Sequence, residues 1–273
     1  MSMTLAPGFH APAGKPVNSV AYERWTGRWS RLFVPLVVAA AEVRTGYRVL
    51  DASTGTGEAA IGVLQTVGPS GLAIGVDIAP AMLMSARERL NTPLFCPVAA
   101  DGQALPFVDA IFDAIVCQLG LQFFPDPARG LLEFRRVLRP GGSAGVCVIS
   151  TPDRAPMWGI LAGALGQRLP AQQSVLNLSF SLSDQDRLHT LFAGAGFRDV
   201  DIERVQREDA MDSFDEYWEP VEGGVGSIPQ FYLTLPDADR LAVRQEVRSQ
   251  LSRFEHNGKL VMSVEMLIAH GRA

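Results

Sequence analysis

Residues 49–57, with the sequence VLDASTGTG, constrain the fold of this chain more than any other stretch. The apolar residues that end at Asp51 predict a buried strand, the small residues after them predict a tight loop, and Glu58 begins a predicted helix. A strand, a glycine loop and a helix in this order bring backbone N–H groups and a helix N-terminus against a ligand. Glycine is favoured in the loop because the backbone must approach the ligand closely and adopt angles that a Cβ atom penalises.

The acidic residue ahead of the glycines bears on which ligand fits. Asp51 places a carboxylate where a dinucleotide would place its pyrophosphate, so we expect a cationic or zwitterionic group beside it. The spacing Gly55-x-Gly57-x-x-Ala60 nevertheless also fits the dinucleotide fingerprint, with Asp77 about 20 residues further on. The loop alone therefore leaves both NAD and another adenosine ligand open.

The composition argues against several classes of protein. With 273 residues, of which 47% are apolar and 19% charged, the chain can bury a sizeable core. Its net charge of −5 argues against a general nucleic-acid binder, which needs a basic surface. The three cysteines lie far apart, without the spacing of metal ligands, so we expect no metal. We find neither a secretory signal nor an apolar run of membrane-spanning length, and we therefore expect a cytoplasmic protein with no membrane span.

Strands and helices alternate through the first half of the chain. Strands are predicted at 48–51, 72–77, 94–99, 111–118 and 143–150, and the helices between them at 58–67, 79–90 and 127–138. Apolar strands that alternate with helices indicate a parallel sheet covered on both faces. With two further strands predicted at 197–205 and 260–269, we expect an α/β fold: a doubly wound, mostly parallel seven-stranded sheet with helical cap segments.

The chain divides into three predicted parts. Residues 1–44 form an N-terminal extension that is loose up to residue 19 and then carries a lid helix at 20–41, interrupted at Gly27 and Pro35. Residues 45–208 and 259–273 form the core, which includes a helix at 183–194 capped by Ser183. Residues 209–258 form a cap insertion before the last strand, with a helix from 237 to 254.

Predicted strands end in four polar residues: Asp51, Asp77, Asp101 and Gln118. Ligands of open α/β sheets bind at this edge. Asp77 can accept two hydrogen bonds from a ribose diol, or it can cap the next helix. Asp101 can accept from an adenine amino group or hold a loop turn. Ile78 and Met82 form an apolar ledge for a purine, or they belong to the core.

A resemblance rests on the order and spacing of five stretches: VLDASTGTG, GVDIAPAML, ADGQALPF, AIVCQLGLQFFPDP and EFRRVLRPGG. With them the chain resembles the class I S-adenosylmethionine-dependent methyltransferases, and more narrowly the small-molecule group similar to the ubiquinone/menaquinone C-methyltransferases (methyltransferase type 11). The resemblance covers residues 22–150 well and is weaker up to residue 205. It implies a Rossmann-like fold and S-adenosyl-L-methionine as cofactor, with S-adenosyl-L-homocysteine as product. It does not identify the methyl acceptor.

The resemblance also implies roles for individual residues. Asp51, Gly55 and Gly57 would line the methionine end of the cofactor, directly or through water. Asp77 would hold the ribose hydroxyls, Asp101 with Gly102 would hold the adenine, and Gln118 would contribute backbone near the sulfonium. Ser53 departs from the family pattern, which usually has a glycine there. A serine fits if its φ stays negative, and its hydroxyl then comes within reach of the ligand.

The acceptor must enter opposite the sulfur, so we expect specificity to lie in three segments: 20–33, 151–181 and 209–258. Their aromatic residues are Tyr22, Trp25, Trp158, Phe180, Tyr217, Trp218, Phe231 and Tyr232. Tyr22 and Trp25 share a helical face that either closes over the cofactor or docks on the sheet. We expect Tyr217 and Trp218 to wall the acceptor, and Phe123 either to wall it or to pack in the core. Such a cavity favours a hydrophobic or aromatic small molecule.

The leading hypothesis is therefore transfer of a methyl group by in-line displacement to a small or medium organic molecule. This reaction needs alignment and exclusion of water more than acid–base groups. None of the four histidines falls at the predicted edge, so no catalytic residue is predicted. Two alternatives remain: a cofactor-binding protein of this fold without methyl transfer (pericyclase-like or ligand-binding), and an NAD(P)-dependent oxidoreductase. The methylated atom and the oligomeric state stay open.

Overall fold

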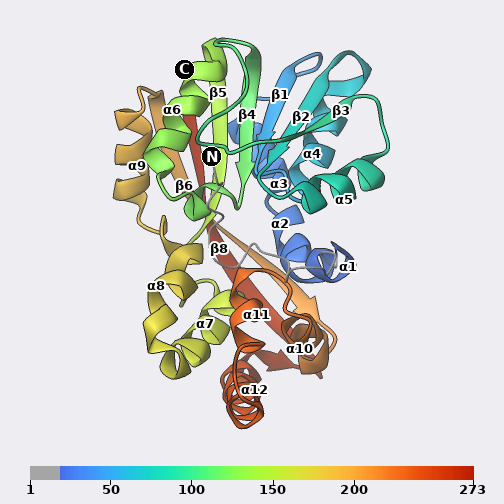
Figure 1. The fold of residues 1–273 in the computed structure, drawn as a ribbon, viewed down its shortest axis with the longest axis vertical. Coiled ribbons are helices and arrows are strands. Elements are labelled where there is room, and N and C mark those ends of the chain that lie inside the picture. The colour runs from blue at the N-terminus through green and yellow to red at the C-terminus, as the bar shows by residue number, and fades with distance from the viewer. Residues whose placement is uncertain (1–18) are drawn as a thin grey trace.

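A computed structural model describes residues 19–273 and arranges them around one large sheet (Figure 1). Its strands are β1 Arg48–Ala52, β2 Leu72–Asp77, β3 Phe95–Ala99, β4 Phe112–Gln118, β5 Leu138–Ile149, β6 Arg198–Met211, β7 Glu255–His256 and β8 Lys259–Arg272. They follow the order β3-β2-β1-β4-β5-β8-β6, and β7 pairs with β8 outside this path. Neighbours from β3 to β5 pair in parallel, whereas β8 runs antiparallel to β5 and β6. The predicted mostly parallel seven-stranded sheet is confirmed, with the two-residue β7 as an addition.

Helices cover both faces of this sheet. They are α3 Val34–Ala40, α4 Glu58–Val67 and α5 Pro80–Leu90 on one face, and α6 Pro127–Val137 and α9 Gln185–Gly194 on the other. Val49 belongs to the apolar cluster of the first face and Leu50 to that of the second, because successive strand side chains point to opposite sides. Both residues are fully buried. This double burial explains why the central strands read as continuous apolar runs.

The strand order reverses between β1 and β4, which are paired at the centre of the sheet. At such a switch point the connections leave in opposite directions and open a crevice at the carboxyl ends of the strands. Asp51 lies at the end of β1 and Gln118 is the last residue of β4. The topology therefore places two of the predicted site residues at this crevice.

Local capping sets the helix boundaries. Asp126 caps α6 by accepting a hydrogen bond from the Arg129 N–H at 3.1 Å. Asp184 caps α9 by accepting from the Arg187 N–H at 3.0 Å. The prediction that Ser183 caps this helix was wrong by one residue, because the carboxylate of Asp184 is the oxygen that reaches the free N–H groups of the first turn.

The N-terminal segment consists of short helical pieces rather than one helix. They are α1 Ser19–Tyr22, a π-helical turn at Glu23–Gly27, α2 Arg28–Arg31 and then α3. Both predicted interruptions are confirmed: the π-helical turn ends at Gly27, and Pro35 lies in the first turn of α3, where a missing N–H costs little. The loose segment predicted at 1–19 lies outside the described residues except for Ser19.

A helical cap extends from one end of the sheet (Figure 1). It consists of α7 Pro156–Arg168, α8 Gln173–Leu176, α10 Phe214–Glu222, α11 Ser227–Tyr232 and α12 Asp237–Leu251. β5 ends where Ile149 pairs with Met266, but β6 and β8 stay paired as far as Met211 and Leu260. This two-stranded ribbon carries the cap, and α7 packs against both α11 and α12. The segment that carries α7 and α8 therefore packs with the predicted insertion, residues 209–258, to form this cap.

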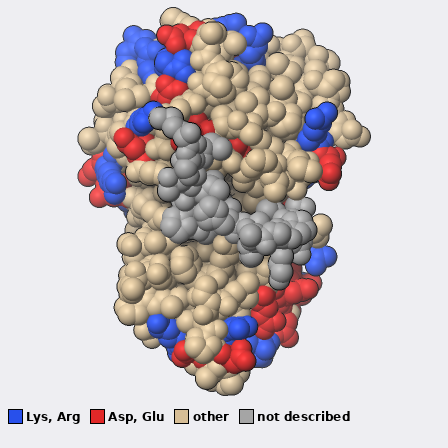
Figure 2. Space-filling view, in the orientation of Figure 1, with Lys and Arg blue, Asp and Glu red and all other residues tan. Residues whose placement is uncertain are grey.

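Ion pairs connect the N-terminal segment to both parts of the molecule. Arg89 of α5 pairs with Glu23 at 2.7 Å, and Arg28 pairs with Asp209 and Glu216 beside the cap. On the face shown in Figure 2, basic and acidic residues lie beside one another at the upper left, and acidic residues gather at the lower right. Among residues 19–273, no helix combines the length and the apolar character needed to cross a bilayer.

Candidate active site

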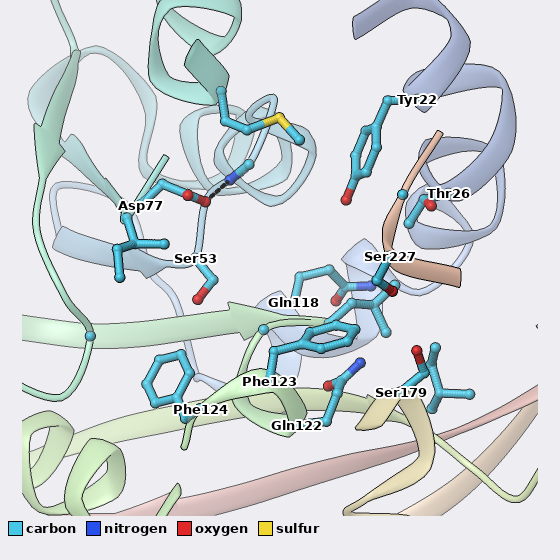
Figure 3. A pocket seen from close by; sticks show the side chains of 18 of the residues that line it. Tyr22, Thr26, Ser53, Asp77, Gln118, Gln122, Phe123, Phe124, Ser179 and Ser227 are labelled. Atoms are coloured by element: carbon cyan, nitrogen blue, oxygen red, sulfur yellow. Dashed lines mark hydrogen bonds between the residues drawn. The ribbon is translucent and has the colours of Figure 1, made fainter. Parts of the chain in front are cut away.

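A cavity lies between the carboxyl ends of the central strands and the cap, and Figure 3 shows the side chains around it. About 1190 Å³ of space lies among the residues that line it, part of which is open to solvent. Predicted site residues that line the cavity are Tyr22, Trp25, Ser53, Gly55, Asp77, Ile78, Met82, Asp101, Gly102, Gln118 and Phe123. The structure therefore gathers the strand ends and the N-terminal segment around one space.

Asp77 accepts hydrogen bonds from the glycine loop and from the turn that leads into α5. Its Oδ2 accepts a hydrogen bond from the Gly55 N–H at 2.9 Å, which Figure 3 marks, and its Oδ1 accepts from the Ala79 N–H at 2.9 Å. Burial raises the pKa of this carboxyl, and the backbone N–H groups partly oppose that rise. The helix cap weighed from the sequence is not formed: the N-cap residue of α5 is Ala79, and Asp77 accepts from the Ala79 N–H rather than from a free N–H group of the first turn. The Asp77 carboxylate also lines the cavity.

Asp51 lies in a smaller adjoining cavity of about 370 Å³, which shares Ser53, Gly55 and Gln118 with the large one. The Thr54 hydroxyl donates to Asp51 Oδ2 at 2.6 Å, while Oδ1 has no hydrogen-bond partner within residues 19–273. Burial raises the pKa of Asp51 to about 7, against the Thr54 hydroxyl and the backbone of α4, which favour the charged form. A buried carboxylate with one unpaired oxygen suits a ligand that carries a cationic group.

The glycine loop adopts left-handed backbone angles. Gly55 has φ 54° and Gly57 has φ 87°, values that glycine adopts readily. Gly57 lines neither cavity, and an added Cβ there would lie 2.9 Å from Leu90 Cδ1, so this glycine lets α5 pack against the loop.

Ser53 shares this left-handed conformation with φ 63°, so the condition under which a serine fits easily, a negative φ, is not met. Space for its side chain comes from Gly120, where an added Cβ would lie 2.4 Å from Ser53 Cβ. A left-handed L-residue costs about 1–2 kcal/mol. The chain therefore carries backbone strain at the wall of the cavity, with the Ser53 hydroxyl directed into it (Figure 3).

The loop after β3 forms one wall of the cavity in the half that lies at the strand ends. Asp101 accepts a hydrogen bond from the Gln103 N–H at 2.8 Å, as expected of a turn, and it also lines the cavity. A Cβ at Gly102 would lie 2.4 Å from the Phe124 ring. Glycine at this position therefore lets the Phe124 ring close the wall.

Tyr217 and Trp218 do not wall the cavity, contrary to the prediction. They are 0% and 1% exposed, and the Tyr217 hydroxyl donates to the Met157 carbonyl at 3.0 Å. The Tyr217 ring meets Trp25 edge-on, with centroids 4.7 Å apart. The apolar face of α10 packs against Trp25, which itself lines the cavity, so the Tyr217 and Trp218 rings lie behind the cavity wall.

Several lining residues were missed or undervalued in the sequence. Trp158 of α7 lines the cavity as expected, and so do three polar residues that the sequence analysis did not name: Gln122, Ser179 and Ser227 (Figure 3). Ile228 and Pro229 complete this side. Gln122 stands beside Phe123 just after a strand-end residue, and that position was the only signal that could have identified it.

Groups able to take up a proton are scarce around the cavity. Its described lining contains no histidine: His189 and His256 are exposed on other elements, His270 contacts the Ala40 carbonyl, and His10 lies outside the described residues. Burial, with Asp77 and Glu23 nearby, raises the pKa of the Tyr22 phenol, which therefore keeps its proton at neutral pH. This agrees with a reaction that depends on alignment rather than on a base.

Comparison with known sequences gives one consistent picture. The model of the ubiE/COQ5 methyltransferase family matches residues 18–207. The demethylmenaquinone methyltransferase of Staphylococcus carnosus is 32% identical over 179 residues, 61% of this chain and 74% of that protein. The ubiquinone/menaquinone biosynthesis C-methyltransferase UbiE of Laribacter hongkongensis is 34% identical over 74% of this chain and 86% of its own. A UbiE of Cupriavidus taiwanensis is 36% identical, and the match spans only 60% of its length.

Solved structures share the fold at low identity. Phosphoethanolamine N-methyltransferase 2 of Haemonchus contortus, in complex with phosphomonomethylethanolamine and S-adenosylhomocysteine, has a TM-score of 0.62 at 15% identity, covering 100% of this chain and 61% of its own. YcgJ of Bacillus subtilis has a TM-score of 0.58 at 18% identity, covering 90% and 98%. The [4+2]-cyclase SpnF has a TM-score of 0.53 at 19% identity, covering 99% and 87%. The fold alone therefore does not select the reaction.

Proposed function

Because the chain belongs to the ubiE/COQ5 methyltransferase family, and is thus a methyltransferase, we propose that it binds S-adenosylmethionine at the strand ends and methylates an uncharged organic molecule beneath the cap. The observation that carries the proposal is the gathering of Asp51, Asp77 and Asp101, from the ends of three neighbouring strands, around two connected cavities.

The donor end of the cavity fits such a cofactor residue by residue. The unpaired Asp51 Oδ1 would meet the amino group of the methionine part. Asp77 would accept from the ribose hydroxyls while it holds Gly55, and Asp101 with Gly102 would take the adenine. Ile78 and Met82 would pack against the purine. A pyrophosphate, in contrast, would bring its negative charge to Asp51, which argues against a dinucleotide.

When bound, S-adenosylmethionine supplies an electrophilic methyl group on a sulfonium. The chain's own task is to hold the acceptor in line with that methyl group and to keep water out. Trp25, Trp158 and Phe123 supply the apolar wall for this purpose. Tyr22 keeps its proton and acts as a hydrogen-bond donor rather than as a base.

The acceptor side favours a hydrophobic or aromatic molecule because aromatic and aliphatic side chains dominate it. The family match ends at residue 207, before α10, α11 and α12. The relatives' quinone-related substrates therefore carry over only as members of this broad class. All three cysteines are free, which supports a reducing compartment such as the cytoplasm.

Titration calorimetry tests the proposal. We expect S-adenosylmethionine and S-adenosylhomocysteine to bind in the micromolar range with one site per chain, and NAD not to bind. Binding should persist in a chelator, since residues 19–273 contain no cluster of metal-ligating side chains. Failure of both adenosyl ligands to bind would refute the proposed function, and selective NAD binding would favour the oxidoreductase alternative.

A further inference from the structure

The acceptor half of the cavity contains buried polar atoms without partners. Gln122 lies in the short helical turn after β4 and is only 2% exposed, yet neither its Nε2 nor its Oε1 has a hydrogen-bond partner among the described residues. Figure 3 shows its amide directed between Phe123 and Ser179. Buried amides are almost always paired in folded proteins, so this one points to a missing partner.

The backbone of Gln122 is connected to the segment before α9. Its carbonyl accepts a hydrogen bond from the Ser181 hydroxyl at 2.8 Å. That contact connects the turn to the segment before α9, which also carries Ser179. Gln122 and Ser179 therefore line the cavity from two segments that are joined by this hydrogen bond.

Gln118 adds a second free acceptor atom. Its Nε2 donates to the Ser30 carbonyl at 3.2 Å, and because a carbonyl only accepts, the amide orientation is fixed. Its Oε1 then has no partner within the described chain. Together the two glutamines offer one NH₂ donor and two acceptor oxygens, a set that a hydroxyl group satisfies by accepting and donating at once.

The charge of the lining restricts the ligand further. Of the described residues around the cavity, only Asp77 and Asp101 are charged, and both lie at the donor end. Lys, Arg and His are absent from this described lining. Apart from the sulfonium of a bound methyl donor, a carboxylate or phosphate on the acceptor would find no cationic partner in the described lining, and burying an unpaired charge costs several kcal/mol.

We propose that Gln122, with Gln118, forms the subsite that binds an uncharged hydroxyl group of the acceptor. The apolar part of the acceptor then lies against Phe123, Trp158 and Ile228. The subsite selects neutral hydroxylated molecules against their carboxylated analogues. The inference rests on the proposed function, because it assumes that the strand-end half holds the methyl donor.

The test combines Gln122→Met, which keeps the length of the side chain, with the exposed control Gln65→Met. In the ligand-free protein we expect Gln122→Met to raise the melting temperature by about 2–4 °C, since a buried amide without a partner is removed. Gln65→Met should leave it unchanged. A fall in the melting temperature of Gln122→Met would show that its amide is paired in the free protein and would overturn the proposal.

Binding of three probes, measured by calorimetry with saturating S-adenosylhomocysteine, completes the test. We expect 1-naphthol to bind about tenfold more weakly to Gln122→Met than to the wild type, as loss of about 1.4 kcal/mol predicts. Naphthalene should bind both equally, and 1-naphthoate should bind neither. Equal 1-naphthol affinity in both proteins, no 1-naphthol binding to the wild type, or 1-naphthoate binding as tight as that of 1-naphthol would contradict the proposal. S-adenosylhomocysteine binding itself reports on the proposed function separately.

Discussion

The two halves of the cavity are built in different ways. The donor half consists of strand ends and the loops that follow them: Asp77 is the last residue of β2, and Ser53 and Asp101 lie just after β1 and β3. The acceptor half is assembled from the N-terminal segment, the turn after β4, α7, the segment before α9 and the first turn of α11. One half depends on local order in the sheet, and the other depends on the docking of a cap.

Because the two halves are built differently, substitutions in them should have different effects. Donor residues are fixed by backbone hydrogen bonds, such as that from the Gly55 N–H to Asp77, and small changes there should alter ligand affinity. Cap residues such as Trp218 are fixed by burial, and changes there should alter stability first. The following predictions test this separation, beginning with the largest expected effect.

Trp218→Ala should lower the free energy of unfolding by about 3–5 kcal/mol, because a large ring is removed from a closely packed core. The ring stacks on Phe214 and meets Tyr232 edge-on. Urea denaturation measures the loss, with Leu233→Ala, a 40% exposed neighbour on the same cap, as the control. A stable Trp218→Ala protein with altered acceptor choice would restore the original assignment of this residue to the cavity wall.

Asp51 should make the stability of the ligand-free protein depend on pH. Its pKa is about 7 in the folded protein, against 3.8 for the free side chain. The folded state therefore binds more protons between pH 4 and 7, and the free energy of unfolding falls as the pH rises through this range. The slope approaches about 1.4 kcal/mol per pH unit.

Asp51→Asn removes the titrating carboxyl, so the difference between this variant and the wild type isolates the pH dependence that Asp51 causes. The free energy of unfolding of the variant, relative to that of the wild type, should be about 2–4 kcal/mol higher at pH 7.5 than at pH 4.5, as measured by urea denaturation at both values. A constant difference between the two proteins would mean that Asp51 titrates normally. S-adenosylmethionine should weaken the pH dependence in the wild type, because a cationic group favours the ionised carboxylate.

Asp77→Ala should weaken binding of S-adenosylhomocysteine at least tenfold. The change removes charge-assisted hydrogen bonds worth about 1.5–3 kcal/mol each and releases the Gly55 N–H that Asp77 holds. Calorimetry with Glu88→Ala as an exposed acidic control on α5 measures the effect. Unchanged affinity would limit Asp77 to holding the glycine loop and the turn before α5.

Ser53→Gly should raise the free energy of unfolding by about 0.5–1 kcal/mol, since relief of the left-handed strain exceeds the added entropy of the unfolded chain. Ser85→Gly, within α5, should instead destabilise the protein by about 0.5–1 kcal/mol. Opposite signs in chemical denaturation would establish strain at Ser53. Equal losses would show that the loop accommodates serine without cost.

The sequence by itself determined the sheet and the donor half. The helix at Glu58–Val67 and the strand at Leu72–Asp77 have the predicted bounds, and α5 begins one residue from its prediction. These elements are set by short-range patterns: apolar runs, glycine turns and proline in a first turn. Because parallel strands place their carboxyl ends at one edge, the acidic residues that follow them had to meet there.

Only the tertiary structure decided the acceptor half. The apolar pattern of α10 indicated that Tyr217 and Trp218 are buried. It did not show that they pack against Trp25 and the cap core rather than against a ligand. Gln122 and Ser179 are 57 positions apart in the sequence and carry no periodic signal, yet they line one cavity. Periodicity records which side of an element is buried, whereas the identity of what buries it depends on long-range packing.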